Sequence, residues 1–574
     1  DPLNWGPPTL RFASDLAGLS DGRYSQSLGN THVVGSEIQS FRGRHTITAG
    51  GEYRHISLDV FGQQDPRGTF SFTGARSGSD FADFLLGLPQ TAATAYGNAD
   101  KFFRSNTYAA YVTDDWRLSP SFTMNIGVRW EYESPVSEQL DRLVNLDVAP
   151  DFTAAEQVVA SDGTGRVTGG GYPQSLVRAD KRGFQPRLGI AWRPVPGSSL
   201  VVRAGYGIYR NTNVYQSIAN QLAQQPPLSN TFEIQHSPLT PLTLADALLV
   251  GQLLGNVATL NTFAVDPELR VGYAQNWQAS VQRDLPMSLT VNATYLGSKG
   301  SHLMQAFVPN TYPIGVVNPC PACPTGFRFL ISDGRSLRHA GQVQLRRRLR
   351  NGFTSSIQYT LAKAMDNAGS FSGASIDTNS LAQNWLDLEA EYARSNFDQR
   401  HQVVATFEYT TGAGILGGTL IDGMKGALFK DWTFTSQITT GTGTPVTPIF
   451  FSPVGRTGIT GSLRPSLTGV SPDPIKDNTY ANVDAFAAPA AGEWGNAPRN
   501  AITGPSQFSM NASVARTFRV GERVNMDFRL DATNVLNRVT FNGIYTQINN
   551  GDLFGTPVST NNMRRLRTSV RFRF

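Results

Sequence analysis

The segment Phe122-Thr-Met-Asn-Ile-Gly-Val-Arg-Trp-Glu-Tyr132 alternates large apolar side chains with small or polar ones at every position. Successive side chains of a β-strand point to opposite faces, so one face of this segment is apolar and the other polar. The apolar set is Phe122, Met124, Ile126, Val128, Trp130 and Tyr132, and the other set is Thr123, Asn125, Gly127, Arg129 and Glu131. A strand of about ten residues with this pattern is long enough to cross a bilayer at a tilt.

The alternation recurs along the chain and comes in pairs of strands. It is clear at 289–295, 353–361, 524–533 and 567–574. Short turns join the paired strands near 42–44, 118–121, 194–197, 284–287, 350–352 and 520–522, with a longer link at 410–430. Long excursions separate the pairs, at 62–106, 135–183, 211–274, 298–339, 365–398, 447–506 and 538–563. Short turns at one end and long loops at the other are typical of a transmembrane antiparallel β-barrel, with periplasmic turns and extracellular loops.

A soluble propeller or a series of sandwiches is the competing interpretation, because alternation also marks half-buried strands. Strands of about ten residues exceed the five or six residues usual in globular sheets. Aromatic residues near the strand ends suit an interfacial girdle: Trp116, Trp130, Tyr132, Trp192, Trp277 and Trp432. Arg347 and Arg516 fall in the apolar register, which requires a bulge or a position at the membrane edge. The barrel is the favoured fold class, all-β.

Composition agrees with this fold and excludes others. The chain has 574 residues, of which 16% are charged, with a net charge of +5. No run approaches the roughly 18 apolar residues of a transmembrane helix, so helical membrane proteins are excluded. The small net charge argues against a nucleic-acid partner.

Counting the paired strands and the final strand gives about fifteen. The first strand starts on the long-loop side and Phe574 ends the last on the short-turn side, which requires an odd number. A closed bacterial barrel has an even number. Either the count is off by one, or residues 1–574 are a single barrel region that forms the C-terminal part of a larger barrel. We expect the latter.

Several segments, in this order, resemble Oar-like TonB-dependent outer-membrane receptors, the group with an N-terminal carboxypeptidase-regulatory-like domain. They include Phe81-Ala-Asp-Phe-Leu-Leu-Gly, Tyr108-Ala-Ala-Tyr-Val-Thr-Asp-Asp-Trp-Arg-Leu and Gln185-Pro-Arg-Leu-Gly-Ile-Ala-Trp. Further along come Gln275-Asn-Trp-Gln-Ala-Ser-Val-Gln-Arg-Asp-Leu, Phe397-Asp-Gln-Arg-His-Gln-Val-Val, Gly495-Asn-Ala-Pro-Arg-Asn and the Arg-Phe-Arg-Phe ending. Each motif is unspecific alone, but together they cover nearly the whole chain.

The resemblance implies a barrel of about 22 strands, plugged by an N-terminal domain and driven by the TonB–ExbB–ExbD complex. Signal peptide, regulatory-like domain, plug and about seven first strands are then expected outside this chain. It also implies location in the outer membrane, contact with its lipid, and assembly by the barrel assembly machinery through the C-terminal strand with Phe572 and Phe574.

Cys320 and Cys323 are the only cysteines and lie among prolines. A CxxC pair can be a redox centre, half a zinc site or a loop disulfide. Without a second CxxC or His pair nearby, a loop disulfide is the favoured interpretation.

No grouping of residues points to catalysis, a cofactor or a metal, so we expect no enzyme. Asp398, Arg400 and His401 are more simply a strand entering the membrane, and Asp366, Asp387, Glu389 and Glu391 a solvated acidic loop rather than a Ca²⁺ site. Residues 242–254 are expected to form a short helix in or over an extracellular loop. The polar register contains charges that predict a ladder along the lumen: Arg129, Glu131, Asp527, Arg529, Asp531, Arg571 and Arg573.

Two functions remain open. The leading hypothesis is an active outer-membrane transporter or receptor for an unidentified bulky or scarce ligand. The alternative is a structural or adhesive surface protein whose loops bind a partner while nothing crosses. A soluble β-rich enzyme is a third, disfavoured, hypothesis.

Overall fold

A computed structural model describes residues 2–12, 16–236, 241–248, 262–368, 381–412, 423–450, 463–474, 479–519 and 524–574. One sheet of 18 strands dominates the fold, and three of its members are strands of two or three residues, β8 (Ser137–Glu138), β14 (Phe263–Val265) and β19 (Ala393–Arg394). The fifteen others are β2 (Gln26–Arg42), β3 (His45–Phe61), β6 (Asp100–Ser119), β7 (Phe122–Glu133), β11 (Phe184–Trp192), β12 (Val201–Arg210), β15 (Tyr273–Leu285), β16 (Leu289–Phe307), β17 (Arg328–Arg350), β18 (Phe353–Asp366), β20 (His401–Thr410), β21 (Thr433–Gly441), β26 (Gln507–Arg519), β27 (Asn525–Thr533) and β30 (Arg565–Arg573). The predicted count of about fifteen strands is confirmed.

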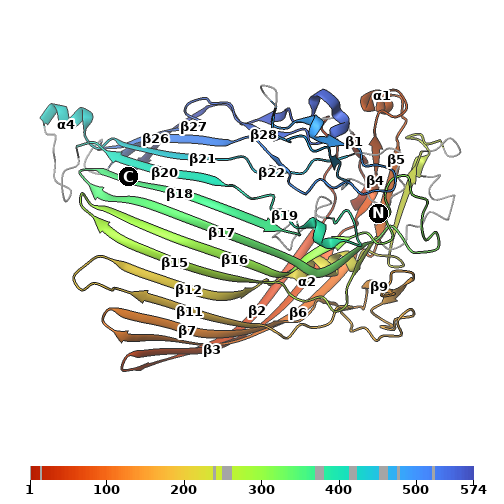
Figure 1. The fold of residues 1–574 in the computed structure, drawn as a ribbon, viewed down its shortest axis with the longest axis horizontal. Coiled ribbons are helices and arrows are strands. Elements are labelled where there is room, and N and C mark those ends of the chain that lie inside the picture. The colour runs from red at the N-terminus through yellow and green to blue at the C-terminus, as the bar shows by residue number, and fades with distance from the viewer. Residues whose placement is uncertain are drawn as a thin grey trace.

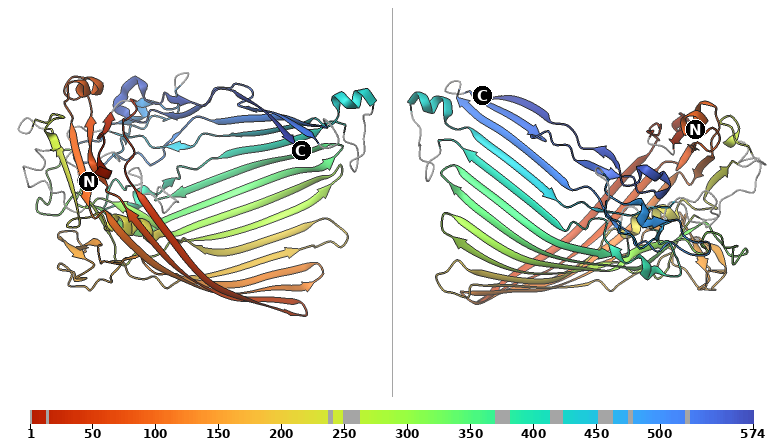
Figure 2. Two further views of the ribbon diagram at one scale, coloured as in Figure 1. Left: turned by 180° about the vertical axis from the view of Figure 1, so that it is seen from behind. Right: turned by 45° about the horizontal axis from the view of Figure 1, so that its top comes forward.

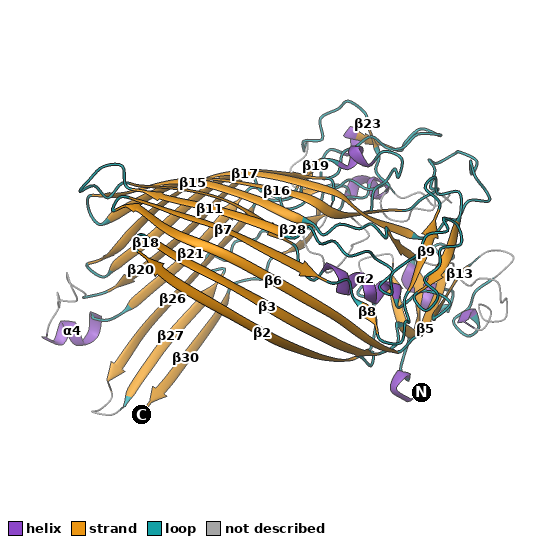
Figure 3. Cartoon of the chain, turned by 90° about the horizontal axis from the view of Figure 1, so that it is seen from below, coloured by secondary structure: helices purple, strands orange, loops and turns teal. Residues whose placement is uncertain are grey.

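Each long strand pairs antiparallel with the next long strand in chain order, from β2 to β30. The sheet curves across its width into a trough (Figures 2 and 3). Among the described residues nothing pairs with the free edges of β2 and β30, so this trough has two open edges.

The two ends of the trough differ as predicted (Figure 1). Short turns and the C-terminus lie at one end, together with helix α4 (Gly423–Phe429) in the longer β20–β21 link. The β17–β18 turn illustrates why short turns could be predicted from the sequence. Asn351 and Gly352 both adopt positive φ, of 52° and 74°, and this conformation favours Asn-Gly in two-residue hairpins.

The long connections pack together at the other end as a loop layer with its own small sheets. These contain β1 (Thr9–Phe12), β4 (Asp65–Phe72), β5 (Thr91–Gly97) and β13 (Ser229–Gln235); β9 (Val144–Val148) and β10 (Ala155–Val159); β22 (Pro445–Val446) and β25 (Ile502–Thr503); β23 (Ser466–Leu467) and β24 (Phe486–Ala487); and β28 (Phe541–Ile544) and β29 (Pro557–Thr560). The helical segments of this end are α1 (Asp80–Leu85), α2 (Val214–Leu222), η1 (Pro2–Asn4), η3 (Leu388–Glu391), η5 (Val483–Ala485) and η6 (Ile548–Leu553).

The largest buried apolar cluster lies at the loop-layer end and is built around α2. The helix buries Val214, Tyr215, Ile218, Ala219 and Leu222, the spacing that places side chains on one side of a helix. They pack in one cluster with apolar residues of the surrounding loops and strand ends. The loop layer is therefore a folded body with a core of its own.

The expected bounds of two excursions are wrong. We expected an excursion at 62–106, but β6 starts at Asp100. We expected a long excursion at 298–339, but β16 continues to Phe307 and β17 starts at Arg328, with register shifts between Gly300 and Gln305. This part of the hairpin extends past the apolar stretch of the strands, so its outer side chains need not be apolar and the alternation that marks a strand in lipid is lost. Of the expected helix at 242–254, Leu242 and Ala247 are buried beside Phe70 and Phe72, and 249–254 lie outside the described residues.

Candidate functional site

The polar side chains of neighbouring strands lie opposite one another and point to the same side of the sheet, where they form a polar face. On β7 and β11, Asn125 lies opposite Gly189 and Gly127 opposite Arg187. The polar sets of later strands also coincide: Asn292 lies opposite Gln282 and Gln344, and Asp531 lies opposite Arg567 at the far edge of the sheet. Three hollows lie along this face, each wide enough for a small solute.

We name the hollows by their lining. The arginine hollow, about 660 Å³, lies over β7, β11, β12 and β15–β17 and includes Arg187, Arg203 and Arg338. The turn hollow, about 560 Å³, lies at the short turns and includes Arg44, Arg117, Arg193 and Arg203. The mixed hollow, about 640 Å³, lies over β17–β27 and contains both signs of charge in Arg346, Glu408, Arg529 and Asp531.

Six of the seven charges predicted for a ladder form ion pairs within the wall. Arg129 Nε lies 3.0 Å from Glu131 Oε2, Arg529 Nε lies 2.8 Å from Asp531 Oδ1, and Arg573 Nε lies 2.7 Å from Asp527 Oδ2. Arg571 lies opposite Asp527 in the β27–β30 register. The structure does not bring the whole set together, because β7 and β27 are ten strands apart in the sheet.

The two arginines in the apolar register lie near the short turns and stack on aromatic rings. The Arg347 guanidinium lies 4.9 Å from the centre of the Phe353 ring, beside a register shift between Arg347 and Arg350. Arg516 lies over Phe518 and Trp432 and donates to the Leu428 carbonyl of α4 at 2.7 Å. The predicted bulge or edge position is confirmed for Arg347.

The acidic residues considered for Ca²⁺ are engaged by protein groups. Glu391 Oε1 and Oε2 each accept a bond of 2.9 Å from Arg464, and Asp366 Oδ1 accepts one from Arg499 at 2.5 Å. Arg499 Nε also lies 3.5 Å from Glu391. Asp387 caps η3 and Glu389 pairs with Arg335. Within the described ranges no group of three or more His, Cys, Asp or Glu side chains could hold a metal ion.

This buried network, Asp366–Arg499–Glu391–Arg464, escaped the sequence analysis. The only available signal was Arg499 within the quoted Gly495-Asn-Ala-Pro-Arg-Asn segment. The possible acid–base set around His401 does not converge, because His401 Nδ1 bonds the Tyr359 hydroxyl at 2.8 Å, whereas Asp398 accepts from the Ala364 amide at 2.7 Å.

The loop layer is held by further polar centres. Buried Asp147 accepts bonds from the amides of Val167 and Thr168, at 2.7 and 2.8 Å, and from the Thr168 and Tyr172 hydroxyls. Burial alone would raise the pKa of Asp147, but these hydrogen bonds outweigh burial and lower it. Burial and the neighbouring carboxylate raise the pKa of Tyr172.

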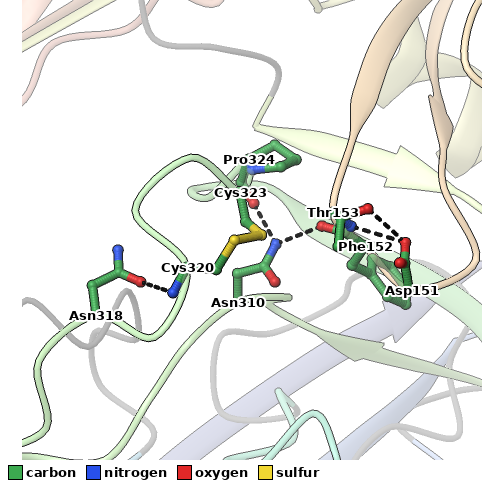
Figure 4. The surroundings of a disulfide bond; sticks show 8 residues. All are labelled: Asp151, Phe152, Thr153, Asn310, Asn318, Cys320, Cys323 and Pro324. Atoms are coloured by element: carbon green, nitrogen blue, oxygen red, sulfur yellow. Dashed lines mark hydrogen bonds between the residues drawn. A yellow bond between two sulfur atoms is a disulfide. The ribbon is translucent and has the colours of Figure 1, made fainter.

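Cys320 and Cys323 form a disulfide in the β16–β17 connection (Figure 4). Asn310 Nδ2 donates to the carbonyls of Pro324 and Phe152, at 2.7 and 2.9 Å. These bonds tie the disulfide-containing loop to the β9–β10 hairpin. The pair is therefore part of the loop layer, remote from the polar face of the trough.

Comparison with known proteins agrees with this architecture. The family profile described as outer membrane beta barrel domain matches residues 1–567. The chain belongs to this family. It is an integral outer-membrane β-barrel protein, and its apolar face contacts lipid while its polar face lines the lumen. Among curated proteins nothing matches.

Solved structures of outer-membrane proteins are similar to this chain at low sequence identity. The outer membrane transporter YddB from Escherichia coli aligns with a TM-score of 0.51 and 9% identity, over 98% of this chain and 57% of that protein. The siderophore receptor PiuA from Acinetobacter baumannii aligns with a TM-score of 0.45 and 10% identity, over 95% and 56%. The chain thus spans little more than half the length of these structures. In the described residues, each helix is too short or too polar to span a membrane.

Proposed function

We propose that this chain is the C-terminal part of an outer-membrane transporter or receptor for a bulky or scarce ligand, energised through TonB–ExbB–ExbD by an N-terminal region of a longer protein. The observation that carries the proposal is the continuous polar wall with solute-sized hollows beneath a folded loop layer. The resemblance in sequence and the fold shared with outer-membrane transporters support it.

The open edges of the trough support the proposal that further strands complete the barrel. An unpaired peptide group in lipid costs several kcal/mol, which is why membrane sheets close. Free edges as long as β2, with 17 residues, and β30, with nine, could not stand in a bilayer. About seven further strands would close a 22-stranded barrel of the kind that encloses a plug. In the same proposal, β30 with Phe572 and Phe574 contacts the barrel assembly machinery.

Closure is tested by hydrogen exchange on the protein extracted from outer membranes as its full chain. The β2 amides that do not bond β3 are expected to be as protected as those of β6, and an intact mass well above that of 574 residues is expected. Rapid exchange along the β2 edge in a monodisperse protein would contradict closure.

Energised transport is tested in cells. The measured quantity is the uptake of solutes from the medium. It is compared between cells that produce the full protein with TonB, the same cells without TonB, and cells that lack the protein. A solute whose uptake requires both is the expected result. If no uptake depends on TonB, the transport proposal fails.

The adhesive alternative rests on a specific surface. Helix α1 and the next residue expose Phe81, Leu85 and Leu86 on the loop layer, with exposed fractions of 47%, 68% and 64%. Exposed apolar groups of this kind suit a protein contact. TonB-independent cell adhesion that is lost in a Leu85→Ser variant would favour this function.

A further inference from the structure

Six arginines that line the arginine and turn hollows have no carboxylate partner within ion-pair distance among the described residues: Arg44, Arg117, Arg187, Arg193, Arg203 and Arg338. Elsewhere on the polar face, Arg129, Arg348, Arg529 and Arg573 each lie within 3.0 Å of an acid. Arg346 and Arg571 also form no ion pair within the described residues, but Arg346 shares the mixed hollow with Glu408 and Asp531, and Arg571 lies opposite Asp527. The arginine and turn hollows differ because no acidic residue of the described chain lines them. The unpaired set therefore calls for an explanation beyond wall stability.

The two hollows adjoin, since both are lined by Thr123, Ala191 and Arg203. We call the joint space the arginine groove. Small residues form its floor, with Gly189 opposite Gly205 and Gly207 opposite Arg187 in the β11–β12 register. A Cβ at Gly205 would meet its nearest atom at 3.6 Å, so the strands themselves do not require glycine there. The missing side chains leave room for a solute between the arginines.

The guanidinium groups have few partners within the protein. Arg187 stacks over the Tyr209 ring at 4.8 Å, Arg203 donates to Gln282 Oε1 at 3.0 Å, and Arg44 donates to the Leu118 carbonyl at 2.7 Å. Each guanidinium has five N–H donors, so most remain for a ligand. The nearby carboxylate of Asp115 accepts from Asn125 instead and lines neither hollow.

We propose that the arginine groove binds and concentrates solutes carrying carboxylate or phosphate groups. This inference rests on the proposed transport function and names the chemistry of its solute. A planar guanidinium matches both oxyanions with paired hydrogen bonds. A cleft lined by one sign of charge also raises the local concentration of counter-ions. The groove extends from the middle of the wall to the short-turn end, which is the route a solute takes towards the periplasm.

The test measures electrostatic potential in the groove and needs no transport. A Thr123→Cys variant of the full protein, in isolated outer membranes at low ionic strength, is modified with an anionic and a cationic methanethiosulfonate of similar size. Thr406→Cys, in the mixed hollow, is the matched control. We expect the anionic-to-cationic rate ratio at position 123 to exceed that at 406 by about tenfold, and the loss of either Arg187 or Arg203 to lower it by about twofold.

Charge removal and competition identify the cause. Arg187→Gln and Arg203→Gln are expected to lower the ratio at position 123, whereas Arg529→Gln is not. Citrate and pyrophosphate are the carboxylate and phosphate probes, and the one that slows modification at lower concentration identifies the preferred group. Ser298→Cys, also in the arginine hollow, replaces the first variant if that one does not assemble.

Three results would overturn the proposal. The ratios at 123 and 406 could be equal, neither anion could protect, or neither reagent could react because a protein segment fills the groove. None of these depends on TonB or on uptake, so the transport proposal can survive this failure. Conversely, a positive potential in the groove of a protein that shows no TonB-dependent uptake would support the groove proposal while the transport proposal fails.

Discussion

Glu391→Gln should loosen the loop layer far more than Glu389→Gln. The Glu391 carboxylate is only 2% exposed and takes both of its short ionic bonds from Arg464, at 2.9 Å, with Arg499 at 3.5 Å. Removing one partner from a buried ion pair leaves uncompensated charge and costs about 3–5 kcal/mol. Glu389→Gln is the control, because the Glu389 side chain is 70% exposed and pairs with a half-exposed Arg335. Such surface pairs contribute about 0–1 kcal/mol.

The assay is site-resolved hydrogen exchange on the full protein in detergent or nanodiscs. The Ala497 amide, bonded to the Pro465 carbonyl at 3.0 Å, reports on the segment that Arg464 and Arg499 hold. A loss of 3 kcal/mol corresponds to a decrease in protection of more than about a hundredfold at this amide. The Tyr359 amide in the β17–β18–β20 ladder should not change, since the wall is held by its own hydrogen bonds.

Equal effects of the two glutamate changes would refute this reasoning, as would intact protection at Ala497 in the Glu391→Gln protein. A double change supplies a further check. Combining Glu391→Leu with Arg464→Met removes both charges of the Glu391–Arg464 pair and should recover part of the protection, because buried ion pairs can be replaced by apolar residues at little cost.

Three further changes test other parts of the structure. Hydrogen bonds hold the pKa of Asp147 below its ordinary value, so the ionised carboxylate stabilises the loop that contains Val167 and Thr168 above about pH 4. This stabilisation is lost as the pH falls through the pKa of the folded state. Asp147→Asn should abolish this pH dependence of amide exchange in the loop. Cys320→Ser should cost the loop layer no more than about 2 kcal/mol, because the disulfide with Cys323 closes a very short ring, and proteolysis with and without reductant measures this. Arg516→Ala should release α4 from the apolar face and raise quenching of Trp432 by aqueous iodide, whereas unchanged quenching would show that Arg516 does not hold the helix.

The wall of the trough could be predicted from sequence because lipid imposes a strict rule on it. Each crossing strand must present apolar side chains on one face, and a period of two shows this directly. Arg129 and Glu131 share a face by that period alone, so their ion pair follows from a single strand. The Arg573–Asp527 pair also required the β27–β30 register, which only the fold supplies.

The loop layer could not be predicted in the same way. Glu391, Arg464 and Arg499 come from segments far apart in the chain, and no period connects them. Their burial depends on mutual pairing, since an isolated buried charge would be too costly. Read singly, such residues look like ordinary surface charges, which is why the acidic loop was expected to be solvated. The strand boundaries at 298–339 were missed for a related reason, because water permits polar side chains on both faces.

The two parts of the molecule therefore depend on different physical forces. The apolar face of the wall contacts lipid, so its side chains gain little from packing within the protein, and ladder hydrogen bonds hold the strands. The loop layer faces water and is held by burial around α2 and by buried ion pairs. Changes in the layer should then loosen the loops without unfolding the wall. The unpaired arginines belong to neither system: they contribute to no core, and no carboxylate lies within ion-pair distance in the described chain. In the proposal above, these groups bind an anionic solute in the lumen, and the cysteine-modification test distinguishes that role from contact with another protein segment.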